Sequence, residues 1–199
     1  MKRTTVDKLA ASIGFTITAV LIVSGVLLTW AHNFVGDQVK TQLSAQKIFF
    51  PPKGSPAIAG PNFTAMQKYA GQQLTTGAQA ETYADHFIAV HLKEAGGGQT
   101  YAQLSTKAQA DPTNTALAGQ VATMFKGETL RGLLLNAYAF GTMGTIAGIA
   151  AIFAFIAAGL MFVLSALGLW HSGRAKKNES VVALPKDSGT TTREPVAVA

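Results

Sequence analysis

The sequence predicts an all-α membrane protein in which two transmembrane helices extend into a small helical domain. Residues 9–36 and 132–173 contain none of the 26 charged residues of the chain. The charged fraction of the whole chain is 13%, compared with about 25% in soluble domains. No segment shows the alternation of polar and apolar residues that is typical of a half-buried strand. The first two observations exclude a single soluble domain, and the third favours helices over strands. Two long apolar stretches are too few for a multi-span transporter.

Residues 9–31 form the first predicted transmembrane helix. Its 23 residues would extend about 34 Å, enough to cross a hydrocarbon core of about 30 Å. Trp30 and Lys8 mark its two ends. A cleaved signal peptide is the alternative, because residues 1–3 are basic and residues 29–31 loosely resemble a cleavage site. The apolar stretch is longer than the roughly 7–15 residues of a signal peptide, so we expect the helix to be retained.

The region between the spans, residues 32–144, is expected to be helical throughout. The first helix should continue through residue 47 and end before Pro51 and Pro52, which cannot extend it. Residues 51–63 are rich in proline and should form a loop, and residues 78–95 should form an amphipathic helix that ends at three glycines. Its apolar stripe is Ala80, Tyr83, Ala84, Phe87, Ile88, His91 and Ala95.

Two further helices are expected before the second span. Thr100 and Gln103 have the spacing of a capping box, for a short helix that should turn Tyr101, Leu104 and Ala108 inward. Asp111-Pro112 should start the next helix, with Asp as its N-cap and Pro in its first turn. The helical pattern then continues to Trp170, and we expect a bend or break near Gly127.

Residues 145–170 form the second predicted transmembrane helix, because they are nearly all Ala, Ile, Phe, Leu, Met and Gly. Basic residues lie close to the ends of the two spans that are nearest the chain termini: Lys2, Arg3, Lys8, Arg174, Lys176 and Lys177. Positive charge next to a span favours the cytoplasmic side. We therefore expect residues 1–8 and 171–199 in the cytoplasm, the latter as a disordered tail, and residues 32–144 outside the cytoplasmic membrane.

Small residues in and before the second span are the candidate helix-packing sites. Gly141, Gly144, Gly148 and Gly159 would let a second helix approach closely, and Gly144 and Gly148 have the G-x-x-x-G spacing. The partner could be the first span, through Gly14, Thr18 and Gly25, or a second copy of the chain. We expect this packing to support self-association or binding to another membrane protein, within the lipid bilayer.

The sequence offers no constellation for catalysis or cofactor binding. His86 and His91 are five residues apart and do not share a helix face, while His32 and His171 lie at opposite ends of different spans. His91 is therefore expected to be a packed core histidine. Glu81 and Asp85 are expected to be solvated charges opposite the apolar stripe. The chain has no cysteine and no cluster of basic residues of the density that nucleic-acid binding needs, so we expect neither cofactor nor nucleic acid.

Three segments resemble a group of uncharacterised actinobacterial membrane proteins that have two spans. The segments are Gln46–Pro52 (QKIFFPP), Tyr83–Leu92 (YADHFIAVHL) and Gly127–Phe140 (GETLRGLLLNAYAF). The resemblance covers about residues 1–172 and does not extend into the tail. It implies the same membrane topology and an actinobacterial source. Members are often labelled after an aromatic ring-opening dioxygenase, a class whose iron is held by two His and one carboxylate.

The sequence as a whole predicts a non-enzymatic accessory or interaction protein of the cell envelope. The helix-packing glycines and the lack of a chemical constellation favour this function. The alternative is an envelope enzyme or ligand sensor, the dioxygenase of the family label included, with a pocket near Tyr83, Phe87 and His91. A polar cavity at these residues would favour the alternative, and a tightly packed core would not.

Overall fold

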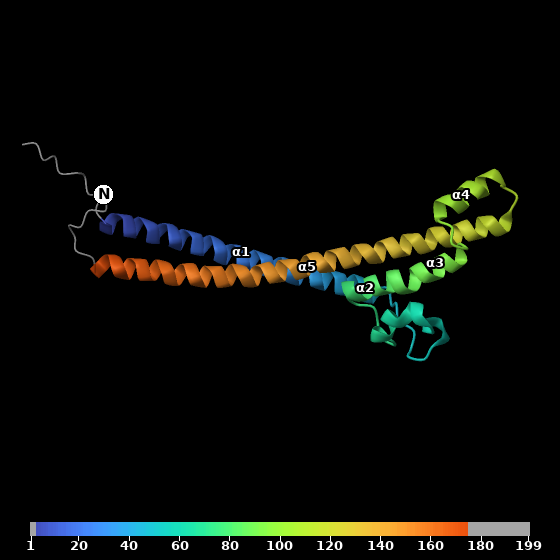
Figure 1. Cartoon of the computed structure of the whole chain (residues 1–199), viewed down its shortest axis with the longest axis horizontal. Helices are drawn as coiled ribbons and strands as arrows, with labels where there is room; N and C mark the ends of the chain where they lie inside the picture. Colours follow the sequence, from blue (N-terminus) through green and yellow to red (C-terminus); the bar gives the residue numbers. More distant parts are fainter. Residues whose placement is uncertain (1–2, 175–199) are drawn as a thin grey trace, which may run out of the picture. The chain divides into compact units, whose positions relative to one another are not determined.

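The computed structural model describes residues 3–174, and all regular structure within them is helical (Figure 1). The predicted all-α fold is therefore confirmed. The elements in chain order are α1 (Arg3–Ala45), η1 (Pro56–Ile58), η2 (Pro61–Tyr69), α2 (Gly77–Tyr83), η3 (Ala84–Ile88), α3 (Ala89–Ala95), α4 (Tyr101–Ala110) and α5 (Thr115–Arg174). Two of them, α1 and α5, are long and apolar enough to cross a membrane.

The helix α1 contains the first predicted span and continues past it, as expected from the sequence. After it ends, Lys47 adopts a left-handed conformation with φ 54°. Residues 48–50 then pair with residues 72–74 through an isolated antiparallel bridge between Phe49 and Gln73. The predicted loop at residues 51–63 contains η1 and the start of η2, two short 3₁₀ helices that each begin with a proline.

The predicted helix at residues 78–95 is present, but it is not α-helical throughout. The segments α2, η3 and α3 follow one another directly, and η3 is one turn of π-helix in which the amide of Ala89 bonds the carbonyl of Ala84. A π turn holds more residues than an α turn, so it rotates everything after it. The residues that become buried are Ala80, Ala84, Ile88 and Leu92, and His91 is exposed. The expectation that His91 is a core residue is therefore wrong.

The capping box of Thr100 and Gln103 is confirmed at the start of α4, where Leu104 is buried. Tyr101 is exposed, contrary to the inward position predicted for it, and its ring lies 5.7 Å from that of Phe125. Asp111 ends α4 and does not start the next helix. The N-cap of α5 is Asn114, whose side chain accepts the amide of Leu117.

The helix α5 passes through Gly127 without interruption, so the predicted break there is wrong. Gly127 instead lies where α3 packs on α5, because a Cβ on it would lie 2.3 Å from Cδ2 of Leu92 in α3. The glycine allows close packing of α3 against α5. At its other end α5 continues to Arg174, so residues 171–174 are helical and do not belong to a disordered tail. The rest of the predicted tail lies outside the described residues.

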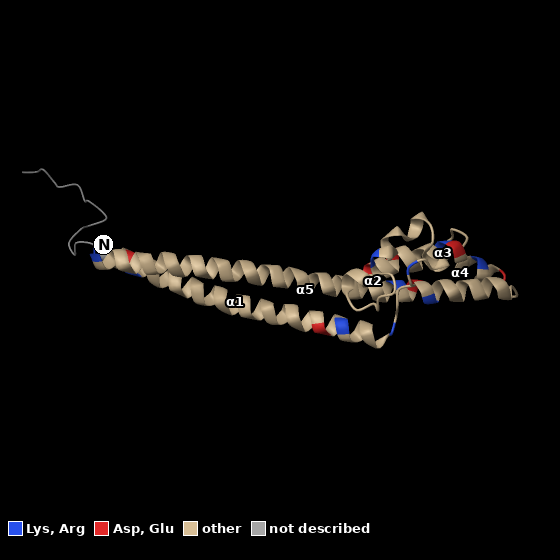
Figure 2. Ribbon diagram, turned by 90° about the horizontal axis from the view of Figure 1, so that it is seen from below, with Lys and Arg blue, Asp and Glu red and all other residues tan. Residues whose placement is uncertain are grey.

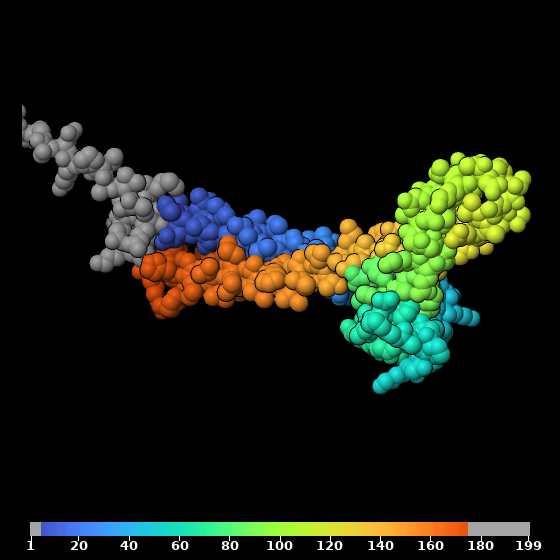
Figure 3. Space-filling model, turned by 45° about the vertical axis from the view of Figure 1, so that its right-hand side comes forward, coloured from blue at the N-terminus to red at the C-terminus, as the bar shows by residue number. Residues whose placement is uncertain are grey.

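The chain divides into two compact units, which are described separately. One unit contains the chain up to Ile22 and from Phe155 onward, and the other is Val23–Ala154. In the first unit, α1 and α5 lie side by side, blue and orange in Figure 3. The second unit has a hydrophobic core, made of Leu43, Phe50, Ile58, Phe63, Met66, Leu74, Ala80, Ala84, Ile88, Leu92, Leu104, Met124 and Leu134.

Candidate helix-packing site

In the first unit, α1 and α5 approach each other closely and run antiparallel. A Cβ on Gly14 would lie 2.0 Å from Oγ of Ser165, and a Cβ on Gly168 would lie 3.9 Å from Cβ of Ala11. The rings of Phe15 and Phe162 meet edge to face, with centroids 5.7 Å apart. At Gly14 any side chain would collide with α5, so this glycine permits the close contact.

In the second unit, His32 and Val35 of α1 contact the glycines predicted for helix packing. Nδ1 of His32 lies 2.8 Å from the carbonyl oxygen of Gly144, within hydrogen-bond distance. A Cβ on Gly148 would lie 2.8 Å from the same Nδ1, and a Cβ on Gly144 would lie 3.1 Å from Cγ1 of Val35. The imidazole ring of His32 therefore lies over Gly148, within hydrogen-bond distance of the carbonyl of Gly144 one helical turn away.

The two remaining candidate glycines have different surroundings. A Cβ on Gly141 would lie 3.3 Å from Cα of Gly77, so its neighbour is the start of α2 and not α1. A Cβ on Gly159 would have no neighbour within 4 Å among the described residues. Gly141, Gly144 and Gly148 thus face neighbouring elements of the same unit, and Gly159 does not contribute to the packing of the two long helices.

The buried side of α5 follows a seven-residue repeat of small residues that the sequence analysis missed. The repeat consists of Ala137, Gly144, Ala151, Ala158, Ser165 and Ser172. All of these except the half-buried Ala137 are buried. In α1 the buried Ala11, Thr18 and Gly25 have the same spacing. A seven-residue period keeps one face of a helix toward a partner along its length, so a search for it would have found these positions.

The outward faces of the two long helices are apolar and exposed. Side chains such as Val20, Ile152 and Phe153 are at least 60% exposed. Figure 2 shows the long stretches of α1 and α5 that have no Lys, Arg, Asp or Glu. Aromatic residues lie near the ends of the predicted spans: Trp30 stacks on Phe34 at 5.3 Å, and the guanidinium of Arg174 lies 3.8 Å from the ring centre of Trp170.

An aromatic cluster occupies the place where the sequence analysis put an alternative pocket. The ring of Phe87 lies 4.8 Å from that of Tyr83 and 4.4 Å from that of His91, and Phe50 and Phe63 contact the same group. Burial raises the pKa of the Tyr83 phenol above its ordinary value of 10.0, so it is neutral at physiological pH. Nδ1 of His91 lies 2.8 Å from the carbonyl oxygen of Phe87.

An ion pair connects the π turn to α5. A terminal nitrogen of Arg131 lies 2.8 Å from Oδ1 of Asp85, and both side chains are half-buried. The side chain of Asp85 is 39% exposed and so keeps part of its expected contact with water, but its ion pair with Arg131 was not predicted. Among the described residues, no three His, Asp or Glu residues are grouped closely enough to hold a metal ion.

The regular structure of residues 3–174 is thus all helical, with two long apolar helices that contact each other through small residues. No protein-family model matches the chain, and no curated protein or solved structure matches it.

Proposed function

We propose that the protein crosses the cytoplasmic membrane twice, through residues 9–31 and 145–170, and is an accessory or interaction subunit of the cell envelope. One observation is the main support: α1 and α5 bury small residues against each other and leave large apolar side chains exposed. In water, that much exposed apolar surface would be unfavourable, whereas lipid is the solvent that suits it. The charge-free stretches at residues 9–36 and 132–173 are each long enough to span a bilayer.

Both ends of the chain are cytoplasmic in this proposal, and residues 32–144 are extracytoplasmic. The basic residues beside the two spans support this orientation, because positive charge favours the cytoplasmic side. Trp30 and Trp170 are 64% and 60% exposed, as expected for aromatic residues at the headgroup level of a bilayer. The outer region is then available for contact with other components of the envelope.

The interaction role rests on the apolar faces that remain free of contacts within the described chain. Gly159 lies on such a face with no neighbour within 4 Å among residues 3–174. Small residues in a membrane helix allow a second helix to approach closely. The half-buried Asp85–Arg131 pair and the aromatic cluster are explained by packing, so they do not require a substrate.

Membrane insertion and topology can be tested on the full chain, which has no native cysteine. The protein should remain in the membrane fraction after extraction with alkaline carbonate. A single cysteine at Lys53→Cys should react with an impermeant maleimide in intact cells, whereas one at Ser180→Cys should react only after lysis. Extraction by carbonate would contradict the membrane proposal, and the reverse labelling pattern would contradict the orientation.

The interaction role requires a separate test. Chemical crosslinking in membranes, followed by affinity purification, should recover the chain together with a second copy or another membrane protein. The variant Gly159→Leu should reduce that recovery, while Gly173→Leu, at another position with no neighbour within 4 Å in the described chain, should not. Recovery of the chain only as a monomer, at its native expression level, would contradict the proposed role.

A further inference from the structure

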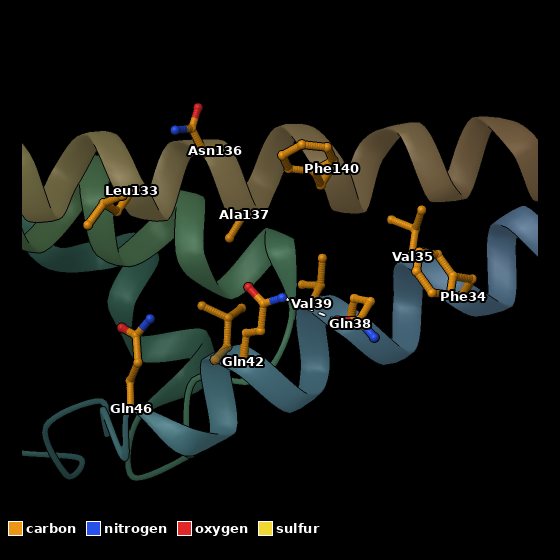
Figure 4. A pocket seen from close by; sticks show the side chains of 11 residues that line it. Phe34, Val35, Gln38, Val39, Gln42, Gln46, Leu133, Asn136, Ala137 and Phe140 are labelled. Atoms are coloured by element: carbon orange, nitrogen blue, oxygen red, sulfur yellow. Dashed lines mark hydrogen bonds between the residues drawn. The ribbon is translucent and has the colours of Figure 1, made fainter.

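A cavity of about 510 Å³ lies between α1 and α5 within the second unit (Figure 4). Its lining comes from the last turns of α1 and from one stretch of α5. The α1 side includes Phe34, Val39 and Leu43, and the α5 side includes Leu133, Ala137 and Phe140. Its volume lies within the range of about 300–1,000 Å³ that small-molecule sites occupy.

The lining is suited to an uncharged, apolar ligand. None of the described residues that line the cavity is ionisable. Val39 and Ala137 point toward each other between the helices, and the amides of Gln38 and Gln42 lie along one side (Figure 4). These two amides are hydrogen-bonded at 3.2 Å. A charged group placed here would lose its hydration without gaining an ionic partner, whereas a hydrocarbon chain would gain by burial.

The cavity is continuous along the chain with the surface that we propose to face lipid. Phe34, which lines it, stacks on Trp30 near the end of the first proposed span. Phe140 lines it from α5 and is 58% exposed, and the exposed Met143 and Ile146 follow within two turns. An apolar chain leaving the outer leaflet beside these residues would therefore find Phe34 and Phe140 at the side of the cavity nearest the spans.

We propose that this cavity holds one acyl chain of a lipid from the outer leaflet. The proposal rests on the proposed membrane location. A second cavity in the same unit, of about 520 Å³, has Lys40 and Thr142 among its lining residues, together with apolar ones such as Val39. This second lining contains a cationic side chain, whereas no residue that lines the first cavity is ionisable.

The test uses the full-length chain in phosphatidylcholine vesicles that contain a phosphatidylcholine with a diazirine in one acyl chain. Irradiation and peptide mass spectrometry should locate adducts at residues 34–46 and 133–140, as well as along the two spans. Adducts in the cavity should saturate as the fraction of probe rises, because the cavity is a site, while adducts along the spans should rise in proportion.

A matched pair of variants identifies the cavity as the site of labelling. Gln42→Trp fills the cavity from an exposed position of α1, and Thr41→Trp adds the same side chain at an exposed neighbour that does not line it. Labelling of residues 34–46 and 133–140 should be lost in the first variant and retained in the second. Both variants should keep the helical circular dichroism of the parent.

Each outcome decides between the proposals. Adducts on the spans without saturable adducts in the cavity would overturn the acyl-chain site and leave the membrane proposal intact. If neither the spans nor the cavity acquire adducts and carbonate extracts the chain, both the membrane proposal and the acyl-chain site would be overturned. Crosslinks between two copies of the chain at residues 34–46, in place of lipid adducts, would show that a second copy occupies the cavity and would also overturn the acyl-chain site.

Discussion

The paired helices, where α1 and α5 contact each other from Gly14 and Ser165 to Val35 and Gly144, are packed differently from the outer core, the hydrophobic core between Leu43 and Leu134. Where α1 and α5 contact each other, the buried residues are mainly Gly, Ala, Ser and Thr, and most large apolar side chains are exposed. In the outer core, Phe50, Met66 and Leu134 are buried and the exterior has charged residues. Burial of large apolar groups stabilises a domain in water, whereas in lipid helices associate mainly through close backbone packing. The difference supports a lipid environment for one region and water for the other.

The largest expected effect comes from the outer core, at Phe50. This side chain is 1% exposed, and its ring lies 5.3 Å from both Tyr69 and Tyr83. Phe50→Ala should lower the free energy of unfolding by about 3–5 kcal/mol, through lost burial and the remaining cavity. The neighbouring Phe49 is 56% exposed, so Phe49→Ala should have a much smaller effect. Thermal unfolding of the purified chain in detergent would measure both, and a loss at Phe50→Ala as small as that at Phe49→Ala would show that Phe50 does not anchor the core.

The next largest effect is expected where α3 meets α5, at Gly127. A Cβ there would lie 2.3 Å from Cδ2 and 3.0 Å from Cγ of the buried Leu92, so the whole side chain would have to shift. Gly127→Ala should therefore destabilise the outer region by about 2–3 kcal/mol. Gly132→Ala in the same helix has no neighbour within 4 Å in the described chain and should stabilise by about 0.4–1 kcal/mol. The opposite signs can be measured by chemical denaturation, and a stabilised Gly127→Ala would contradict the close packing.

A smaller loss is expected in the paired helices, at Gly148. A Cβ on this residue would lie 2.8 Å from the ring of His32, which the carbonyl of Gly144 also holds. Gly148→Ala should lower the stability of the detergent-solubilised chain by about 1–2 kcal/mol, because the ring must move and its hydrogen bond weakens. Gly159→Ala should leave the stability of the single chain unchanged or slightly raised. If both substitutions have the same effect, Gly148 is not a contact between the helices.

The long helices and the N-cap of α4 could be predicted from the sequence because their signals are local. Charge-free stretches and the T-x-x-Q pattern at residues 100–103 depend on residues close together in the chain. The same pattern at Thr76 and Gln79 forms a second capping box, which a systematic search would have found. In that box Gln79 is buried, and its oxygen accepts the amides of Thr75 and Thr76.

The errors of the sequence analysis come from contacts between distant segments. Gly127 is a weak helix former, so a bend or break was expected near it, but α5 is continuous there and the close approach of Leu92 favours a residue without a side chain. The π turn could not be predicted from a 3.6-residue period, and it moved His91 out of the stripe. Of the candidate glycines, Gly144 and Gly148 were chosen for their G-x-x-x-G spacing and the other two as small residues. The buried side of α5 instead follows a seven-residue repeat, which includes Gly144 but not Gly141, Gly148 or Gly159.

The smallest expected effect concerns the ion pair between Asp85 and Arg131, which the sequence analysis also missed. Their nearest atoms lie 2.8 Å apart, but both side chains are about one third exposed, so water screens the attraction. Asp85→Asn should reduce the stability of the outer region by about 0.2–1 kcal/mol, and high salt should reduce that difference. Glu94→Gln, on the exposed side of α3, is the matched control and should change stability less. If Asp85→Asn does not change the stability at low salt, hydrophobic packing alone holds the π turn against α5. The outer core would then resemble the paired helices, because neither would depend on charged residues for its stability.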